Sequence, residues 1–200
     1  MRVLGITGGT GTGKSMVSSI LKKKGCEVID ADAITKDLQR KGCPVFNKIV
    51  ECFGDGVVDG ESGELDRKKL AKIVFGDDEA RLKINAIVHT AVAAEIKRRL
   101  KLLEKRGVPY VVLDVPVPVE NGFFDVSDVV WAVCANDDIR IERIMDRSGM
   151  TQEEAEARIG AQLSNREYAE LADVVIDNEG TAEELEKLVM YEFERTVGKL

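Results

Sequence analysis

The sequence GGTGTGKS at residues 8–15 decides which fold this chain is expected to adopt. It matches the pattern G-x-x-x-x-G-K-[ST] at Gly8, Gly13, Lys14 and Ser15. The strand-like RVLGIT precedes it, and it leads into the helix-like KSMVSSILKKKG, which is the context that a phosphate-binding loop requires. The alternative, a glycine-rich turn that binds nothing, is disfavoured by this position and spacing.

The residue types of this loop suit a polyphosphate. Glycines let backbone N–H groups turn toward phosphate oxygens, where a side chain would obstruct them. Lys14 can reach the β- and γ-phosphates, Ser15 can ligate magnesium, and the helix N-terminus favours negative charge. Such a loop does not by itself distinguish kinases from GTPase switches or motor ATPases, so other positions must decide.

Five short apolar runs predict strands at residues 3–6, 27–29, 110–115, 129–134 and 174–176. Helical patterns lie between them, and this alternation predicts an α/β fold with a parallel five-stranded sheet flanked by helices. Right-handed crossovers would then place the carboxyl ends of the strands, and any ligand, along one edge of the sheet.

Two intervals without a predicted strand are expected to form helical subdomains. The first, at about residues 33–107, contains the turn-rich GDGVVDGESGELDR and ends in a long charged helix at about 78–105. The second, at about residues 137–165, begins with DDIRIERIMDR. It continues with a helix that opens at Thr151, for which Glu154 is a capping-box partner.

Composition restricts the functions to be considered. The 200 residues, 44% of them hydrophobic, are enough for a single domain over residues 1–200. A net charge of -7 argues against a general nucleic-acid or membrane-surface binder. Four cysteines without C-x-x-C spacing and one histidine argue against a zinc site and favour reduced thiols. We expect a cytoplasmic protein, because no apolar run approaches membrane-spanning length. No obligate protein partner is evident from the sequence.

Acidic residues follow two of the predicted strands. Asp30 and Asp32, in EVIDADAI, are predicted at the carboxyl end of the second strand. Residues two apart in a strand point to the same side, so both carboxylates are expected to face the γ-phosphate. One would take a magnesium-bound water and the other a proton from an attacking hydroxyl, or both would merely cap the next helix. Asp114, which ends the third strand, either assists magnesium or is purely structural.

Three arginines in DDIRIERIMDR, at positions 140, 143 and 147, are spaced to share one face of a helix. Such a face could close as a lid over a triphosphate and neutralise charge in the transition state. The alternative is a solvated helix in which the arginines pair with their acidic neighbours Asp138, Glu142 and Asp146.

Six segments spread along the chain resemble one known family. They are GGTGTGKS, VIDADAI, GELDRKKLAKIVF at 63–75, IVH at 87–89, LDVPVPVE at 113–120 and ADVVIDNEGT at 172–181. Together they resemble dephospho-CoA kinase, nearly from end to end. The resemblance implies a P-loop kinase core with a helical substrate-binding domain and a lid. It also implies transfer of the γ-phosphate of ATP to the ribose 3′-hydroxyl of dephospho-CoA, with Mg²⁺ as cofactor.

The resemblance further implies which residues act on ATP. The ATP loop comprises Gly11, Thr12, Gly13, Lys14, Ser15 and Met16. Arg143 and Arg147 match the R-x-x-x-R pattern of the family's lid, and Asn178 falls where a loop near the adenine is expected. Lys14 and Arg143 are thereby expected to take part in catalysis.

The acceptor and the metal are assigned in the same way. Asp32 is the expected base for the 3′-hydroxyl and contacts the substrate, while Asp30 joins Ser15 in the magnesium shell. Arg67 and His89 match positions in the substrate-facing domain. The partners implied are therefore ATP and dephospho-CoA, with no nucleic acid and no membrane.

Three positions depart from the family pattern. Thr90 follows His89 where proline is usual, which is expected to alter how the long helix begins or bends. The sequence Pro-Val-Pro at 116–118 replaces the usual P-L-L and is expected to move a pocket wall. Arg140 stands where glutamine is common. The changes at Thr90 and at 116–118 touch neither the P-loop nor the two aspartates of EVIDADAI.

Two other functions are compatible with a phosphate-binding loop in this position. A kinase for another acceptor, such as a nucleoside monophosphate or a small hydroxy acid like shikimate, would use the same loop and lid. A nucleotide-dependent switch that binds a protein partner is the other rival. A GTPase switch should carry N-K-x-D for guanine, but the only Asn-Lys pair, in NKIV at 47–50, lacks the aspartate.

Overall fold

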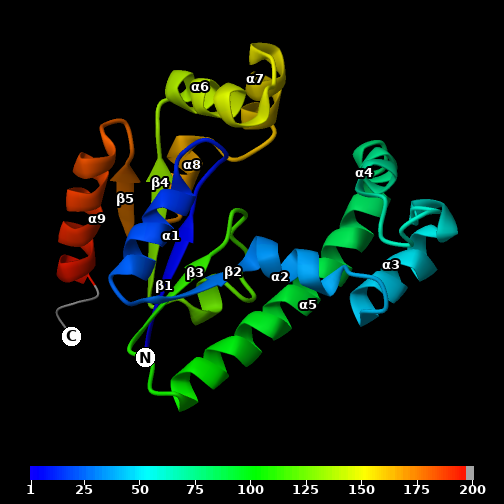
Figure 1. Cartoon of the computed structure of the whole chain (residues 1–200), viewed down its shortest axis with the longest axis horizontal. Coiled ribbons are helices and arrows are strands. Elements are labelled where there is room, and N and C mark those ends of the chain that lie inside the picture. The colour runs from blue at the N-terminus through cyan, green and yellow to red at the C-terminus, as the bar shows by residue number, and fades with distance from the viewer. Residues whose placement is uncertain (197–200) are drawn as a thin grey trace. The chain divides into compact units, whose positions relative to one another are not determined.

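The computed structural model describes residues 1–196 and contains a five-stranded parallel sheet (Figure 1). Its strands are β1 (Arg2–Thr7), β2 (Glu27–Asp30), β3 (Tyr110–Asp114), β4 (Val129–Cys134) and β5 (Val174–Asp177). Their order across the sheet is β2-β3-β1-β4-β5, and every neighbouring pair is parallel. The predicted strands and the α/β class are confirmed, and β1, which leads into the glycine-rich loop, is central.

The helices in the described part of the chain also follow the predicted pattern. They are α1 (Lys14–Lys23), α2 (Ala31–Leu38), α3 (Pro44–Phe53), α4 (Arg67–Phe75), α5 (Asp78–Lys105), α6 (Asp137–Ser148), α7 (Gln152–Gly160), α8 (Asn165–Glu170) and α9 (Ala182–Thr196). Short 3₁₀ turns occupy Asp55–Val57 and Phe124–Val126. The long charged helix predicted at 78–105 is α5, and it continues without interruption through Thr90, because threonine keeps the backbone N–H that proline lacks.

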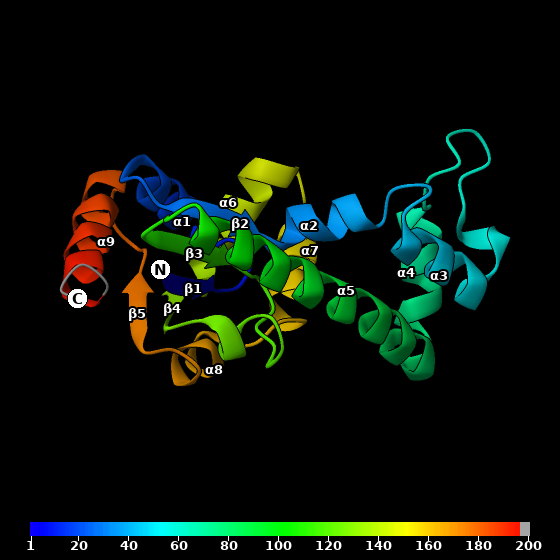
Figure 2. The same ribbon diagram turned by 90° about the horizontal axis from the view of Figure 1, so that it is seen from below.

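Helices cover both faces of the sheet, which is why the strands are almost continuously apolar. Trp131 and Val133 of β4 point into a core shared with α1 and α9. Ala132 and Cys134, one residue out of phase, point to the opposite face and pack with Tyr168 of α8. Figures 1 and 2 show α1 and α9 on one side of the sheet and α8 on the other.

The chain divides into two compact units. One comprises residues 1–30 together with the chain from Arg99 onward, and the other comprises residues 31–98. The second unit has its own small apolar core, whose buried residues are Val45, Ile49, Val57, Leu70 and Ile84. It overlaps the helical insertion predicted at about 33–107, whose role in binding substrate stays a prediction.

The predicted lid segment at 137–165 contains α6 and α7. These helices share a small core in which Ile144 is fully buried and Ala155 and Ile159 pack against it. The predicted capping box at the start of α7 is confirmed. Thr151 Oγ1 accepts a hydrogen bond from the backbone N–H of Glu154 at 3.3 Å, and the Glu154 carboxylate accepts one from the Thr151 N–H at 3.0 Å.

Candidate active site

The glycine-rich loop lies between β1 and α1, as predicted. Helix α1 begins at Lys14, and its N-cap, Gly13, has a φ of 88° in the left-handed region that favours glycine. A Cβ atom at Gly13 would also overlap Nδ2 of Asn178, so both conformation and space require glycine there. The predicted ATP residues thus form the end of this loop and the first turn of α1.

The carbonyl groups of the loop are held by side chains from distant segments. Arg140 Nε donates to Thr10 O at 2.9 Å, and Asn178 Nδ2 donates to Thr12 O at 2.8 Å. In a planar trans peptide the following N–H points opposite to the carbonyl. The N–H groups of Gly11 and Gly13 therefore point away from the side chains that hold the loop, which leaves them oriented for an anion.

Lys14 forms an ion pair with Asp114, the last residue of β3. The second carboxylate oxygen of Asp114 accepts a hydrogen bond from Ser18 Oγ at 2.6 Å, and both Lys14 and Asp114 are largely buried. The sequence left the role of Asp114 open, and it was not among the predicted site residues. Its signal was an acidic residue at the carboxyl end of a strand. What was missing was the strand order that places β3 beside β1.

The predicted arrangement of Asp30 and Asp32 is wrong in one respect. Strand β2 ends at Asp30 and helix α2 begins at Ala31, so Asp32 lies in the first turn of a helix. Because successive helical residues are rotated by about 100°, the two carboxylates do not share a strand face. Asp30 is instead in register with Asp114 on the adjacent strand β3, and both Asp30 and Asp32 are exposed.

The three arginines of α6 differ in their surroundings. Arg140 is only 1% exposed and pairs with Asp137 at 2.8 Å, so it is not part of an open arginine face. Arg143 is partly buried, and its Nη1 donates to Gly11 O at 3.3 Å. Arg147 is exposed. The helix therefore contacts the loop through Arg140 and Arg143, while Arg147 remains accessible to solvent.

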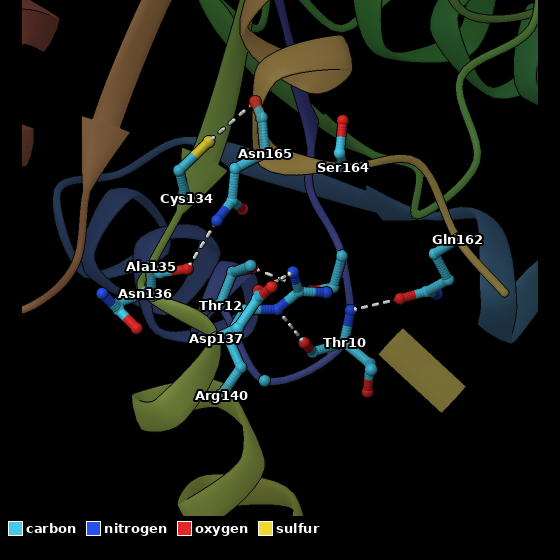
Figure 3. Close-up of polar contacts among 12 residues, drawn as sticks. Thr10, Thr12, Cys134, Ala135, Asn136, Asp137, Arg140, Gln162, Ser164 and Asn165 are labelled. Carbon is cyan, nitrogen blue, oxygen red and sulfur yellow. Dashed lines mark hydrogen bonds and ion pairs between the residues drawn. The ribbon is translucent and has the colours of Figure 1, made fainter. Parts of the chain in front are cut away.

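Two amide side chains complete the surroundings of the loop. Asn178, directly after β5, is buried and its amide is engaged with Thr12, so its predicted place near an adenine stays a prediction. Gln162 was not predicted. Its Oε1 accepts a hydrogen bond from the Thr10 N–H at 2.8 Å (Figure 3), and no local sequence pattern indicates this contact.

Arg67 and His89 both lie within the unit of residues 31–98 and are exposed. Arg67 is the first residue of α4, whose N-cap Asp66 accepts hydrogen bonds from two backbone N–H groups. These hydrogen bonds lower the pKa of the Asp66 carboxyl. Arg67 lines a pocket of about 410 Å³ whose other lining residues are Lys36, Gln39, Arg40, Glu64 and Leu65. Three of the lining side chains are cationic and one is acidic, and one of the cations, Arg40, is paired with Asp37 at 2.9 Å.

Comparison with known proteins identifies the family. A family model described as dephospho-CoA kinase matches residues 2–184. This chain belongs to the dephospho-CoA kinase family. A dephospho-CoA kinase of Symbiobacterium thermophilum is 49% identical over 181 residues, which cover 90% of this chain and 75% of the relative. A dephospho-CoA kinase of Carboxydothermus hydrogenoformans is 40% identical over 188 residues, which cover 94% of this chain and 91% of that relative.

The fold agrees with that of a solved relative. A crystal structure of a Thermus thermophilus protein is 32% identical to this chain and superposes with a TM-score of 0.82, covering 98% of this chain and 97% of its own. The dephospho-CoA kinase family predicted from the sequence is therefore confirmed. Membership of a kinase family also decides against the nucleotide-dependent switch. Among the helices described, none is both long and apolar enough to cross a bilayer.

Proposed function

We propose that this chain transfers the γ-phosphate of ATP to the ribose 3′-hydroxyl of dephospho-CoA, giving coenzyme A and ADP. The observation that carries the proposal is the family match over residues 2–184. The loop geometry supports it, because Lys14 is held at the start of α1 by Asp114 and the loop carbonyls are tied back by side chains. A cytoplasmic location stays a prediction.

The phosphate groups of ATP would bind at the loop and at the N-terminus of α1. Phosphoryl transfer has a loose transition state, so positioning and charge neutralisation supply most of the catalysis. Lys14 and the loop N–H groups would orient the β- and γ-phosphates. Arg143 and Arg147, on the same helix, would neutralise charge as it develops on the transferred group.

Asp32 is the proposed general base. It would accept the proton of the 3′-hydroxyl as that oxygen attacks phosphorus, while ADP leaves with the bridging oxygen. The support is the VIDADAI segment and the exposure of Asp32 in the first turn of α2.

Oxygen donors for Mg²⁺ are present at the carboxyl edge of the sheet. Asp30 and Asp114 are in register on adjacent strands, and Ser15 lies exposed in the first turn of α1. Within residues 1–196, no group of three or more His, Cys, Asp or Glu side chains could hold a metal ion. Mg²⁺ usually binds through one or two carboxylates together with substrate phosphates and water. When bound, the ion would neutralise charge on the phosphates.

The anionic acceptor would bind in the unit of residues 31–98. Dephospho-CoA carries a diphosphate group, and the pocket beside Arg67 also contains the cationic side chains of Lys36 and Arg40. Arg67 is the residue that the family resemblance assigns to substrate binding. His89, exposed on α5, is proposed as a further acceptor contact.

The assay that tests the function measures ADP release from ATP and magnesium with dephospho-CoA as acceptor. AMP, CMP, shikimate and a reaction without acceptor are run beside it. Selective turnover of dephospho-CoA, with coenzyme A identified as product, is the expected result. If only another acceptor is phosphorylated, the protein is still a kinase, but dephospho-CoA is not its substrate. No turnover with any of them would overturn the proposal.

Asp32→Asn is expected to lower kcat by about 100-fold, the lower end of what a general base contributes, while leaving the KM for ATP nearly unchanged. Steady-state kinetics with varied ATP and varied dephospho-CoA measure both effects. Asp78→Asn is the matched control, because Asp78 is also an exposed carboxylate in the first turn of a helix. Near wild-type turnover in Asp32→Asn would remove Asp32 from this role.

A further inference from the structure

Arg140 is a buried cation that the proposed mechanism does not use. It lies on α6 with 1% of its surface exposed, which is rare for arginine because removing a charge from water is costly. Its guanidinium is held at two points (Figure 3): Nε donates to Thr10 O at 2.9 Å and Nη1 to Asp137 Oδ1 at 2.8 Å. The side chain therefore joins the start of the lid helix to the P-loop.

The third nitrogen of this guanidinium is placed against Gly9. Nη2 of Arg140 is buried and makes no hydrogen bond to the described residues. A Cβ atom at Gly9 would overlap it. Gly9 does not have a positive φ, unlike Gly8, Gly11 and Gly13, so its backbone conformation does not require glycine. Arg140 is the neighbour that a Cβ atom at position 9 would overlap most, and Gln162 Oε1 would lie 3.3 Å from the same Cβ.

The same short stretch of the loop is held from a second direction. Gln162 Oε1 accepts from the Thr10 N–H at 2.8 Å, while Arg140 donates to the carbonyl of that residue. Both hydrogen-bonding groups of the Thr10 backbone are therefore engaged by side chains that come from positions more than 100 residues away in the chain. Thr10 is thereby fixed in orientation from its N–H to its carbonyl.

We propose that Arg140 is a positioning residue that presets the P-loop for the phosphates of ATP, and that Gly9 is the glycine that admits its guanidinium. Arg140 acts through the peptide at Thr10, whereas Arg143 and Arg147 are proposed to act on the phosphates directly. The proposal rests on the assignment of the P-loop to ATP, and it does not depend on the identity of the acceptor.

The first test changes Arg140 and measures ATP affinity by calorimetry without any acceptor. Arg140→Gln removes the charge and is expected to raise the Kd for ATP by about 10-fold or more, the scale of a lost charge-assisted hydrogen bond. Arg140→Lys keeps the positive charge but lacks the planar guanidinium with its several N–H donors. Its affinity for ATP should therefore lie between those of Arg140→Gln and the wild type. Arg166→Gln is the control, since Arg166 is exposed and pairs with Glu170 on α8. It should bind ATP as the wild type does.

The second test is a double-mutant cycle with Gly9→Ala. In the wild-type background the added methyl group must displace Arg140 or the loop, so the Kd for ATP should rise by about 10-fold. In Arg140→Gln the shorter side chain leaves room, and adding Gly9→Ala should change the Kd by less than about twofold. This dependence on residue 140 is specific to the proposed fit of the Arg140 guanidinium against Gly9.

Several outcomes would overturn the proposal. A lower unfolding temperature in Arg140→Gln with unchanged ATP affinity would make the residue merely structural. If Gly9→Ala weakens ATP binding equally in the wild type and in Arg140→Gln, the Arg140 guanidinium is not the reason for glycine at position 9. If Arg140→Gln does not fold, the comparison of Gly9→Ala in the wild type and in Arg140→Lys decides. Equal losses would again overturn the proposal, and a smaller loss beside lysine would support it. Wild-type turnover of dephospho-CoA, measured separately, tests the proposed function independently.

Discussion

The ion pair between Lys14 and Asp114 determines where the P-loop ammonium sits. Lys14 has a long flexible side chain, and ordering it costs conformational entropy. Ser18 Oγ donates a hydrogen bond to Asp114 Oδ2 at 2.6 Å, which orients the carboxylate that pairs with Lys14. The resulting chain of contacts from Ser18 to Asp114 to Lys14 holds a positive charge beside the loop.

We therefore expect Asp114→Asn to lower both stability and use of ATP. Breaking a buried ion pair leaves Lys14 without its partner, and the free energy of unfolding should fall by about 3 kcal/mol. The kcat/KM for ATP should fall by about 10-fold or more, on the scale of one charge-assisted contact. Denaturant unfolding and steady-state kinetics measure the two effects. Ser18→Ala, which removes only the supporting hydrogen bond, should cost about 1 kcal/mol. A fully active Asp114→Asn would contradict this role.

Helix starts are encoded by a local pattern that recurs three times. Thr151 with Glu154, Ser164 with Glu167, and Thr181 with Glu184 each place a hydroxyl residue three positions before a glutamate. In all three the hydroxyl accepts from the glutamate N–H and the carboxylate accepts from the first residue's N–H. Only the first was predicted from the sequence, although the other two carry the same signal.

Ser164→Ala is expected to lower the free energy of unfolding by about 1 kcal/mol at neutral pH, because the first turn of α8 loses its cap. Hydrogen bonds from Ser164 lower the pKa of the Glu167 carboxyl in the folded protein. The stabilisation that these hydrogen bonds give is fully present above the pKa of glutamate in the unfolded chain, about 4.3. It is lost as the pH falls through the lower pKa that Glu167 has in the folded protein. The difference between Ser164→Ala and wild type should therefore shrink in acid. Urea unfolding at pH 7 and pH 3 measures it, and a constant difference would contradict the expectation.

At the scale of the whole molecule, the two buried cysteines report on the integrity of the sheet. Cys26 packs in the core between the sheet and helices α1 and α9, and Cys134 packs on the opposite face. Burial raises the pKa of each thiol to about 11, and for Cys134 the charge of Asp177 adds to the shift. Both thiols are therefore neutral and inaccessible while the core is intact.

A thiol reagent at pH 8 should modify the exposed Cys52 first and the partly buried Cys43 next. Cys26 and Cys134 should react only as fast as the core opens, and all four should react in guanidinium. Mass spectrometry of labelled peptides measures the order of labelling, and rapid labelling of Cys26 in the native protein would contradict this order.

The same two thiols predict how stability depends on pH. Because their folded pKa values exceed the free-thiol value of about 8.5, the free energy of unfolding should fall as the pH rises from about 8.5 toward 11.

The features that contiguous residues encode were predictable from the amino-acid sequence. Five apolar runs predicted the strands, the glycine-rich motif predicted the loop between β1 and α1, and the six segments predicted the family. These predictions succeeded because strand periodicity, glycine conformation and helix capping depend on neighbours within a few positions. The same locality explains why α5 was predicted with its correct limits at 78–105.

The meeting of distant side chains at the loop could not be predicted, because it depends on how the whole chain packs. Helical spacing placed Arg140 and Arg143 on one face, but it does not show that Arg140 is buried against Thr10. The order of strands brought Asp114 beside Lys14, and the direct passage from β2 into α2 separated the directions of Asp30 and Asp32. These contacts join positions up to 166 residues apart, as between Thr12 and Asn178. They arise from burial of both faces of one sheet, which no local pattern specifies.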